Sequence, residues 1–162
     1  MELLWHELMG GLPDRRQLAF VLIRVIAASL LGGIVGLQRE RAGKPAGLRT
    51  HMLVSLGTAV VVLAGSGAGM NTDGLSRVIQ GIVTGIGFVG AGAILKLNEQ
   101  REIQGLTTAA GLWITAAIGV ACGVGALGLA VIATILAVMV LALESVEKWL
   151  EKDRKNKRNV SS

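Results

Sequence analysis

Five stretches of this chain are apolar over about the length that crosses a lipid bilayer. A transmembrane helix needs roughly 20 mostly apolar residues to span about 30 Å of hydrocarbon. The candidate spans are residues 18–37, 51–68, 78–95, 105–123 and 125–143. Only one charged residue, Arg24, interrupts them. We therefore predict an all-α fold, a polytopic membrane helix bundle of about five transmembrane helices.

Composition supports the same class. The chain is 52% hydrophobic but only 17% charged, and its mean hydropathy of +0.61 is too high for an ordinary soluble domain. A single cysteine excludes a disulfide scaffold, and 3% aromatic residues argue against a stacking surface for nucleic acid. The net charge of +5 therefore predicts a membrane orientation and no nucleic-acid partner.

The basic residues divide unevenly between the two sides of a five-span chain. Segments 38–50, 96–104 and the tail after residue 143 together carry twelve of the 16 lysines and arginines. The opposite side carries only Arg15, Arg16 and Arg77. The positive-inside rule then places the N-terminus outside and the C-terminus in the cytoplasm.

Three segments follow from this topology. Residues 1–17 form a periplasmic or interfacial N-terminal segment, either a short helix lying in the membrane surface or a frayed terminus. It lacks the positive start of a secretory signal peptide. Residues 18–143 form the transmembrane domain, and residues 144–162 form a short basic cytoplasmic tail.

Glycine is abundant, with 23 residues, and it predicts close helix packing. Lipid gives no hydrophobic drive between helices, so association depends on small residues that let backbones approach. The third span has glycines on two faces, which predicts a central helix with neighbours on both sides. The candidate packing positions are Gly32, Gly36, Gly81, Gly85, Gly87, Gly90, Gly92, Gly105 and Gly123.

Arg24 is the most unusual placement, because a cation inside a span is costly and is often a functional mark. It shares a stripe with Ala28, Gly32 and Gly36, which favours an inward direction. The alternative is snorkelling toward the nearer membrane surface.

The loop after the first span combines dense charge with turn residues. Thr50 is a candidate cap for the second span, and Arg49 lies where an anion could bind. A solvated loop that touches lipid phosphates is the alternative. The candidate ligand or partner residues here are Arg39, Glu40, Arg41, Lys44, Pro45, Arg49, Thr50 and His51.

Asp73 and Arg77 lie four residues apart at the outer end of the third span, where they can pair along a helix. A hydrated Mg²⁺ can use one or two carboxylates. A lone aspartate is more typical of a helix cap, which is the role we predict for Asp73.

No catalytic set emerges from the sequence. The two histidines, His6 and His51, fall on opposite sides of the membrane, and Cys122 has no candidate base beside it. We therefore expect no enzyme activity, no metal site and no cofactor.

These residues resemble the MgtC/SapB family of bacterial inner-membrane proteins. The shared motifs, in chain order, are Arg24, Gly36-Leu-Gln-Arg-Glu-Arg41, Lys44-Pro-Ala-Gly-Leu-Arg-Thr-His51, Asp73 with Arg77, Gly85-Ile-Gly-Phe-Val-Gly-Ala-Gly92, Gly105-Leu-Thr-Thr-Ala-Ala-Gly-Leu-Trp113 and Ala116-Ala-Ile-Gly-Val-Ala-Cys-Gly123. The resemblance covers roughly residues 20 to 140.

The resemblance implies a multi-pass protein of the bacterial plasma membrane. It also implies adaptation to low magnesium and a link to virulence, through regulation of another membrane complex such as the proton-translocating ATP synthase. An oligomeric transporter or channel for Mg²⁺ or another ion is the alternative. Beyond the lipid bilayer, the implied partners are a membrane protein or a small hydrophobic peptide, with a homo-oligomer as an option. Many family members carry a soluble domain after the last span, whereas here we expect a short form.

Overall fold

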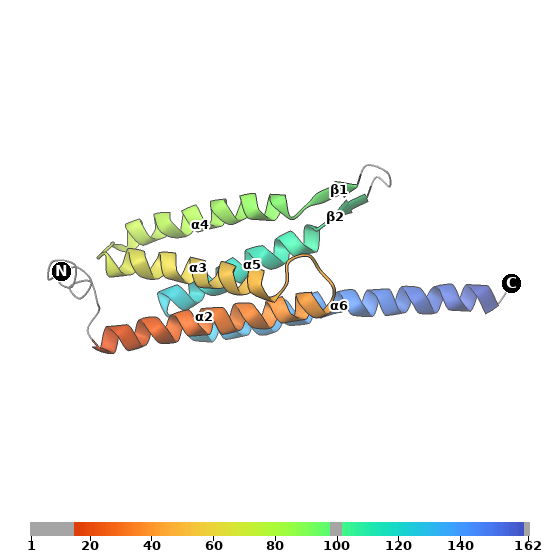
Figure 1. Cartoon of the computed structure of the whole chain (residues 1–162), viewed down its shortest axis with the longest axis horizontal. Coiled ribbons are helices and arrows are strands. Elements are labelled where there is room, and N and C mark those ends of the chain that lie inside the picture. Colours follow the sequence, from red (N-terminus) through yellow and green to blue (C-terminus); the bar gives the residue numbers. More distant parts are fainter. Residues whose placement is uncertain (1–14, 98–101, 161–162) are drawn as a thin grey trace, which may run out of the picture.

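The computed structural model describes residues 15–97 and 102–160, and these form five long helices and one small hairpin (Figure 1). The predicted all-α membrane bundle is confirmed. The helices are α2 (Arg15–Arg41), α3 (Leu48–Gly67), α4 (Thr72–Gly92), α5 (Leu106–Val124) and α6 (Leu127–Val160). The N-terminal segment predicted for residues 1–17 lies almost wholly outside the described residues.

Four of these helices, α2 to α5, are long and apolar enough to cross a membrane, and Leu127–Leu143 forms a shorter apolar part of α6. Successive helices run in opposite directions along the bundle, and α6 extends well past the other helices (Figure 1). The predicted basic tail is thus helical through Val160, in keeping with its good helix formers, glutamate and lysine.

The segment between the third and fourth spans, predicted only as a loop, contains two short strands. Strand β1 (Leu95–Leu97) pairs antiparallel with β2 (Glu102–Gln104), and Leu95 lies opposite Gln104. This hairpin projects at the end of the bundle where α2 ends and α3 begins (Figure 1). We call it the basic end, because it carries Arg39, Arg41 and Arg49.

Helix α5 is the centre of the bundle, and α4 lies at its edge. Buried residues make up 56% of the apolar window of α5 but only 11% of that of α4. Helix α5 contacts each of the other four helices, whereas α4 packs mainly against α3 and α5. The prediction of a central third span was therefore wrong, because glycine permits close packing but does not demand it.

Close backbone approach occurs instead where α3 packs against α2 and α5. A Cβ added to Gly36 would lie 2.8 Å from the Leu48 Cα, and one added to Gly32 would lie 2.7 Å from the His51 carbonyl oxygen. On α5, a Cβ on Gly123 would lie 2.7 Å from the Val62 Cβ. Gly119 is equally tight, against Ser55 and Thr58.

The other glycine positions differ. Gly90 has only ordinary contact with Ala109, at 3.6 Å from an added Cβ, and Gly105 is the N-cap of α5 with φ of +95°. Four glycines of α4 have open space where a Cβ would stand, as far as the described residues show: Gly81, Gly85, Gly87 and Gly92. Among the described residues, these four positions have no packing partner, so their packing role stays a prediction.

A pair of substitutions tests this division. Gly119→Ala places a methyl group on the α3 backbone and should lower the free energy of unfolding by about 1–3 kcal/mol, the usual cost of overpacking. Gly85→Ala meets nothing and should leave stability unchanged or raise it by up to about 1 kcal/mol, through helix propensity. Reversible unfolding of the purified protein in mixed micelles measures both, and equal losses would contradict the assignment of α4 to the edge.

Candidate functional site at the basic end

The loop between α2 and α3 forms a turn that is held by a hydrogen bond between the two helices. The Oε2 of Glu40 accepts a hydrogen bond from the Leu48 backbone N–H at 2.8 Å, so a carboxylate caps the first turn of α3. A Cβ on Gly47 would lie 2.8 Å from the same oxygen, which explains a glycine there. Negative charge is stabilised at a helix N-terminus, so Glu40 occupies the place where a bound anion would sit.

The cap predicted at Thr50 was wrong. Helix α3 begins at Leu48 with Gly47 as its N-cap, and Thr50 is an exposed residue inside the first turn. A backbone N–H at the start of α3 is satisfied instead by the side chain of Glu40, at the end of α2. That partner, Glu40, lies eight residues before Leu48, outside the few residues that local capping patterns cover.

Arg39 is almost fully buried, with 1% of its surface exposed. Its Nη2 donates to the Thr108 Oγ1 at 3.3 Å, which ties the end of α2 to the start of α5. Arg39 was predicted as a candidate ligand or partner residue of the charged loop, and its burial was not predicted. The sequence contains a pattern that indicates this burial: Ala28, Gly32, Val35 and Arg39 recur at helical spacing and so share one face of α2. The structure shows that all four are buried.

His51 is completely buried on α3, and Ser55 lies one turn further along the same face, also completely buried. The His51 Nδ1 lies 3.0 Å from the Gly47 carbonyl oxygen. A carbonyl only accepts, so Nδ1 carries the proton and Nε2 is left as an acceptor. Among the described residues, neither Nε2 nor the Ser55 Oγ has a hydrogen-bond partner.

We call Arg39, His51, Ser55 and Thr108 the buried polar row. It joins α2, α3 and α5 at the basic end, inside a part of the chain where polar groups are costly and are often functional. Sequence reasoning did not single out Ser55 or Thr108, because isolated hydroxyl residues in apolar runs carry no distinctive pattern.

The remaining predicted residues of this loop face outward. Lys44 is half-buried, and the exposed set comprises Glu40, Arg41, Pro45, Arg49 and Thr50. Thus the structure brings His51 and Arg39 into the interior and leaves most of the predicted loop cations on the surface. These exposed cations are suited to the phosphates of a membrane surface.

Arg24 lies toward the opposite end and points inward, as its stripe predicted. Its Nη1 donates to the Gly123 carbonyl oxygen at 3.1 Å, in the last turn of α5. The C-cap, Gly125, has φ of +88°, and an added Cβ would lie 2.5 Å from the Arg24 Nη2. A cation at a helix C-terminus satisfies carbonyls that have no partner within the helix. Arg24 is therefore a cap supplied by α2.

Asp73 does not cap α4. The N-cap is Asn71, whose side chain accepts from the Gly74 N–H at 2.9 Å. Asp73 and Arg77 are both exposed in the following turn, and no ion pair joins them in the described part of the chain. They lie on a different helix from Arg24, and the structure does not join either of them to the buried polar row.

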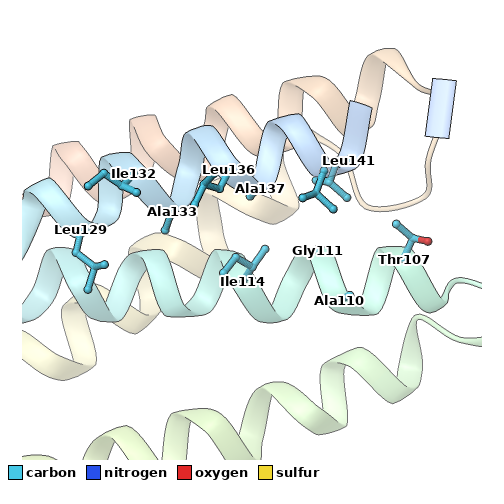
Figure 2. A pocket seen from close by; sticks show the side chains of 11 residues that line it. Thr107, Ala110, Gly111, Ile114, Leu129, Ile132, Ala133, Leu136, Ala137 and Leu141 are labelled. Atoms are coloured by element: carbon cyan, nitrogen blue, oxygen red, sulfur yellow. The ribbon is translucent and has the colours of Figure 1, made fainter. Parts of the chain in front are cut away.

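A groove of about 480 Å³ lies between α5 and α6. Figure 2 shows Ala133 and Leu141 on α6 pointing toward α5, and Ile114 on α5 pointing toward α6. Sequence reasoning missed this groove, since it depends on how two apolar helices diverge. Among the residues described, no group of three histidine, cysteine or acidic side chains could hold a metal ion.

Fold and site together define a polytopic helical membrane protein whose interior carries a buried polar row. Residues 25–149 match the sequence model of the MgtC family, and the chain belongs to that family. This confirms the resemblance drawn from its motifs.

Three curated relatives show the extent of the match. SrpB of Synechococcus elongatus is 40% identical over 130 residues, covering 74% of this chain and 71% of SrpB. YhiD of Escherichia coli K12, whose name provisionally describes a magnesium transporter, is 42% identical over 127 residues, 74% of this chain and 58% of YhiD. MgtC of Salmonella typhimurium LT2 is 43% identical over 124 residues, 76% of this chain and 52% of MgtC. No solved structure matches the chain.

The Arg24 cap makes a direct prediction. Arg24→Gln removes the charge from the α5 terminus and should lower the free energy of unfolding by about 1–2 kcal/mol, whereas Arg24→Lys should keep part of it. Unfolding in mixed micelles provides the measurement, and the exposed Arg41→Gln is the matched control, expected within about 0.5 kcal/mol of wild type. Wild-type stability of Arg24→Gln would show that the cap contributes nothing.

Proposed function

We propose that this chain is a regulator in the bacterial inner membrane that acts in adaptation to low magnesium. It binds another integral membrane complex by helix–helix contact, and the proton-translocating ATP synthase is the partner that the family resemblance suggests. The chain spans about half the length of MgtC and somewhat more of YhiD. The proposal therefore concerns what the membrane helices do by themselves.

The observation that carries this proposal is the uncovered face of α4. Within the described residues, Gly81, Gly85 and Gly92 have open space where a Cβ would stand, and Phe88 between them is 85% exposed. These positions recur at helical spacing and form one face. On this face the aromatic ring of Phe88 projects between glycines, which leave shallow depressions because they have no side chain. We call this surface the α4 face. Between helices in lipid, such hollows allow the backbone approach on which association depends.

The other side of α4 is already engaged. Ile86 and Gly90 are its buried residues, and Gly90 contacts Ala109 of α5. Helix α4 is thus held by the bundle along one side and presents the α4 face on the other. This geometry suits a helix that recognises a partner without leaving its own fold.

Ion transport has weaker support from the described residues. An ion path through a membrane protein is lined by polar groups that the ion can reach. The buried polar row supplies such groups, but its charged member is a cation, Arg39, held by Thr108. The same row is closed off by the tight glycine contacts between α2 and α3.

A photocrosslinking pair tests the proposal. A benzophenone amino acid replaces Phe88 on the α4 face, or Ile86 on the buried side as a matched control, in cells growing in low magnesium. The account predicts adducts with a membrane subunit of the ATP synthase from position 88, and at least fivefold fewer from position 86. Gly85→Leu should remove the adducts while leaving the unfolding midpoint unchanged, because it fills a hollow only at the interface.

Two results would count against it. If position 88 formed adducts only with a second copy of the chain, the α4 face would be a homo-oligomer interface and the regulator proposal would be contradicted. Mg²⁺ flux through purified protein in liposomes, with no adduct to any partner, would favour the transport alternative.

A further inference from the structure

A second groove, of about 400 Å³, lies between the end of α2 and helix α6, and we call it the α2–α6 groove. These two helices pack side by side, and α6 continues beyond the end of α2 (Figure 1). The groove is lined by Ile34, Leu37, Gln38 and Arg41 of α2, by Ala42 just after that helix, and by Val138 of α6. The four α2 residues recur at helical spacing and share one face. Along this face the lining changes from apolar to polar toward the basic end, over a rise of about 10 Å.

Both polar side chains of the groove present hydrogen-bond donors. Arg41 is exposed, and a guanidinium has five N–H donors and no acceptor. The Oε1 of Gln38 is buried, so the amide can offer the groove only its NH₂ group, which donates. The groove therefore has the polarity that suits a ligand with negative charge and hydrogen-bond acceptors.

The charge of Arg41 is not neutralised by another residue in the described part of the chain. No ion pair to Arg41 is found there, and the neighbouring acid, Glu40, has its Oε2 committed to the Leu48 N–H at 2.8 Å. Arg39, in contrast, is buried and donates to Thr108. Arg41 is thus the cation of the last turn of α2 that can form a charge-assisted hydrogen bond with a ligand from the membrane.

The end of α2 does not prevent an anion from binding there. A helix C-terminus carries partial negative charge on carbonyl groups that lack partners, and this charge disfavours an anion. Here the carbonyl oxygens of Gln38 and Glu40 accept from the N–H groups of Ala42 and Gly43, at 3.1 and 3.0 Å. These hydrogen bonds reduce the partial negative charge beside Arg41.

We propose that the α2–α6 groove binds an anionic phospholipid with a single phosphodiester, of the phosphatidylglycerol class. The phosphodiester accepts from Arg41 and Gln38, and one acyl chain lies against Ile34 and Leu37, whose side chains are 50% and 38% exposed. One cation matches one phosphodiester. A free phosphate ion leaves the apolar part of the groove uncovered, and a zwitterionic lipid brings a second cation toward Arg41.

The position of the groove agrees with the predicted topology. Its polar part is at the basic end, which the positive-inside rule places at the cytoplasmic surface. Anionic lipids give the cytoplasmic leaflet a negative surface potential that attracts basic residues beside a transmembrane helix. From there the apolar part of the groove extends toward the bilayer centre, which is the direction of an acyl chain in that leaflet.

Photolabelling of the purified full chain in non-ionic detergent micelles tests the proposal. The probe is phosphatidylglycerol with a diazirine near the start of one acyl chain, and the label should map to Ile34, Leu37 and Val138. Unlabelled phosphatidylglycerol should displace the probe about fivefold better than phosphatidylcholine with the same acyl chains, the effect of one basic residue near a membrane surface. Soluble glycerol phosphate at the same concentration should not displace it.

Two results of the competition would overturn the proposal. Equal displacement by the two lipids would show that the negative charge of the lipid is not recognised. Displacement by glycerol phosphate as effective as that by phosphatidylglycerol would show a site for a phosphate ion, to which the apolar lining contributes nothing.

Two charge-matched variants separate this site from general attraction to the basic end. Arg41→Gln and Arg49→Gln each remove one exposed cation there, but Arg49 lies outside the groove lining. Arg41→Gln should abolish the preference for phosphatidylglycerol and Arg49→Gln should keep it, with the unfolding midpoint of both unchanged in lipid-free micelles. Equal loss of the preference in both variants would refute the site.

A third variant tests the amide donor. Gln38→Glu replaces the NH₂ group by a carboxylate three residues from Arg41, where the two side chains can pair along the helix. Labelling by the phosphatidylglycerol probe should then fall about as far as in Arg41→Gln. Wild-type labelling of Gln38→Glu would contradict the donor role of Gln38.

Discussion

Backbone-to-backbone contact of α3 with α2 and α5 is the constraint on which the rest of this structure depends. Lipid supplies no hydrophobic drive between helices, so cohesion comes from packing and from hydrogen bonds that small residues make accessible. Gly36 of α2 and Gly119 of α5 allow these approaches to α3. This close core carries His51 and Ser55 into the interior and brings Arg39 within reach of Thr108.

Two charged side chains complete the core by capping helices other than their own. Arg24 of α2 donates to the last turn of α5, and Glu40 of α2 accepts from the first turn of α3. Each charge has the sign that the helix terminus favours. Residues that look like candidates for ion or ligand binding thus have a physical role within the bundle. In the described part of the chain, the buried side-chain atoms that lack a hydrogen-bond partner include the Nε2 of His51, the Oγ of Ser55 and the Oε1 of Gln38.

The sequence was sufficient for the fold class, because long apolar runs leave a membrane helix as their stable form. It was also sufficient for the inward direction of Arg24, which follows from helical spacing alone. It was insufficient for α4: glycines on two faces predicted a central helix, yet only one side of α4 is covered. Likewise, Thr50 and Asp73 were predicted as caps from local pattern, whereas α3 is capped by Glu40 from the end of α2 and α4 by its own N-cap residue, Asn71. The Glu40 cap joins two helices and has no local signature, whereas Asn71 is a local N-cap of the usual kind that the prediction for Asp73 overlooked.

The central claim is that one side of α4 is packed against the bundle while the α4 face is left open for contact. Lipid-phase oxygen accessibility of single spin labels along α4 tests it most directly, in dilute liposomes and in a Cys122→Ser background. The account predicts maxima at positions 81, 85, 88 and 92 and minima at 86 and 90, with helical periodicity. Protection at 85 and 88 equal to that at 86 and 90 would contradict it, since α4 would then be enclosed on both sides.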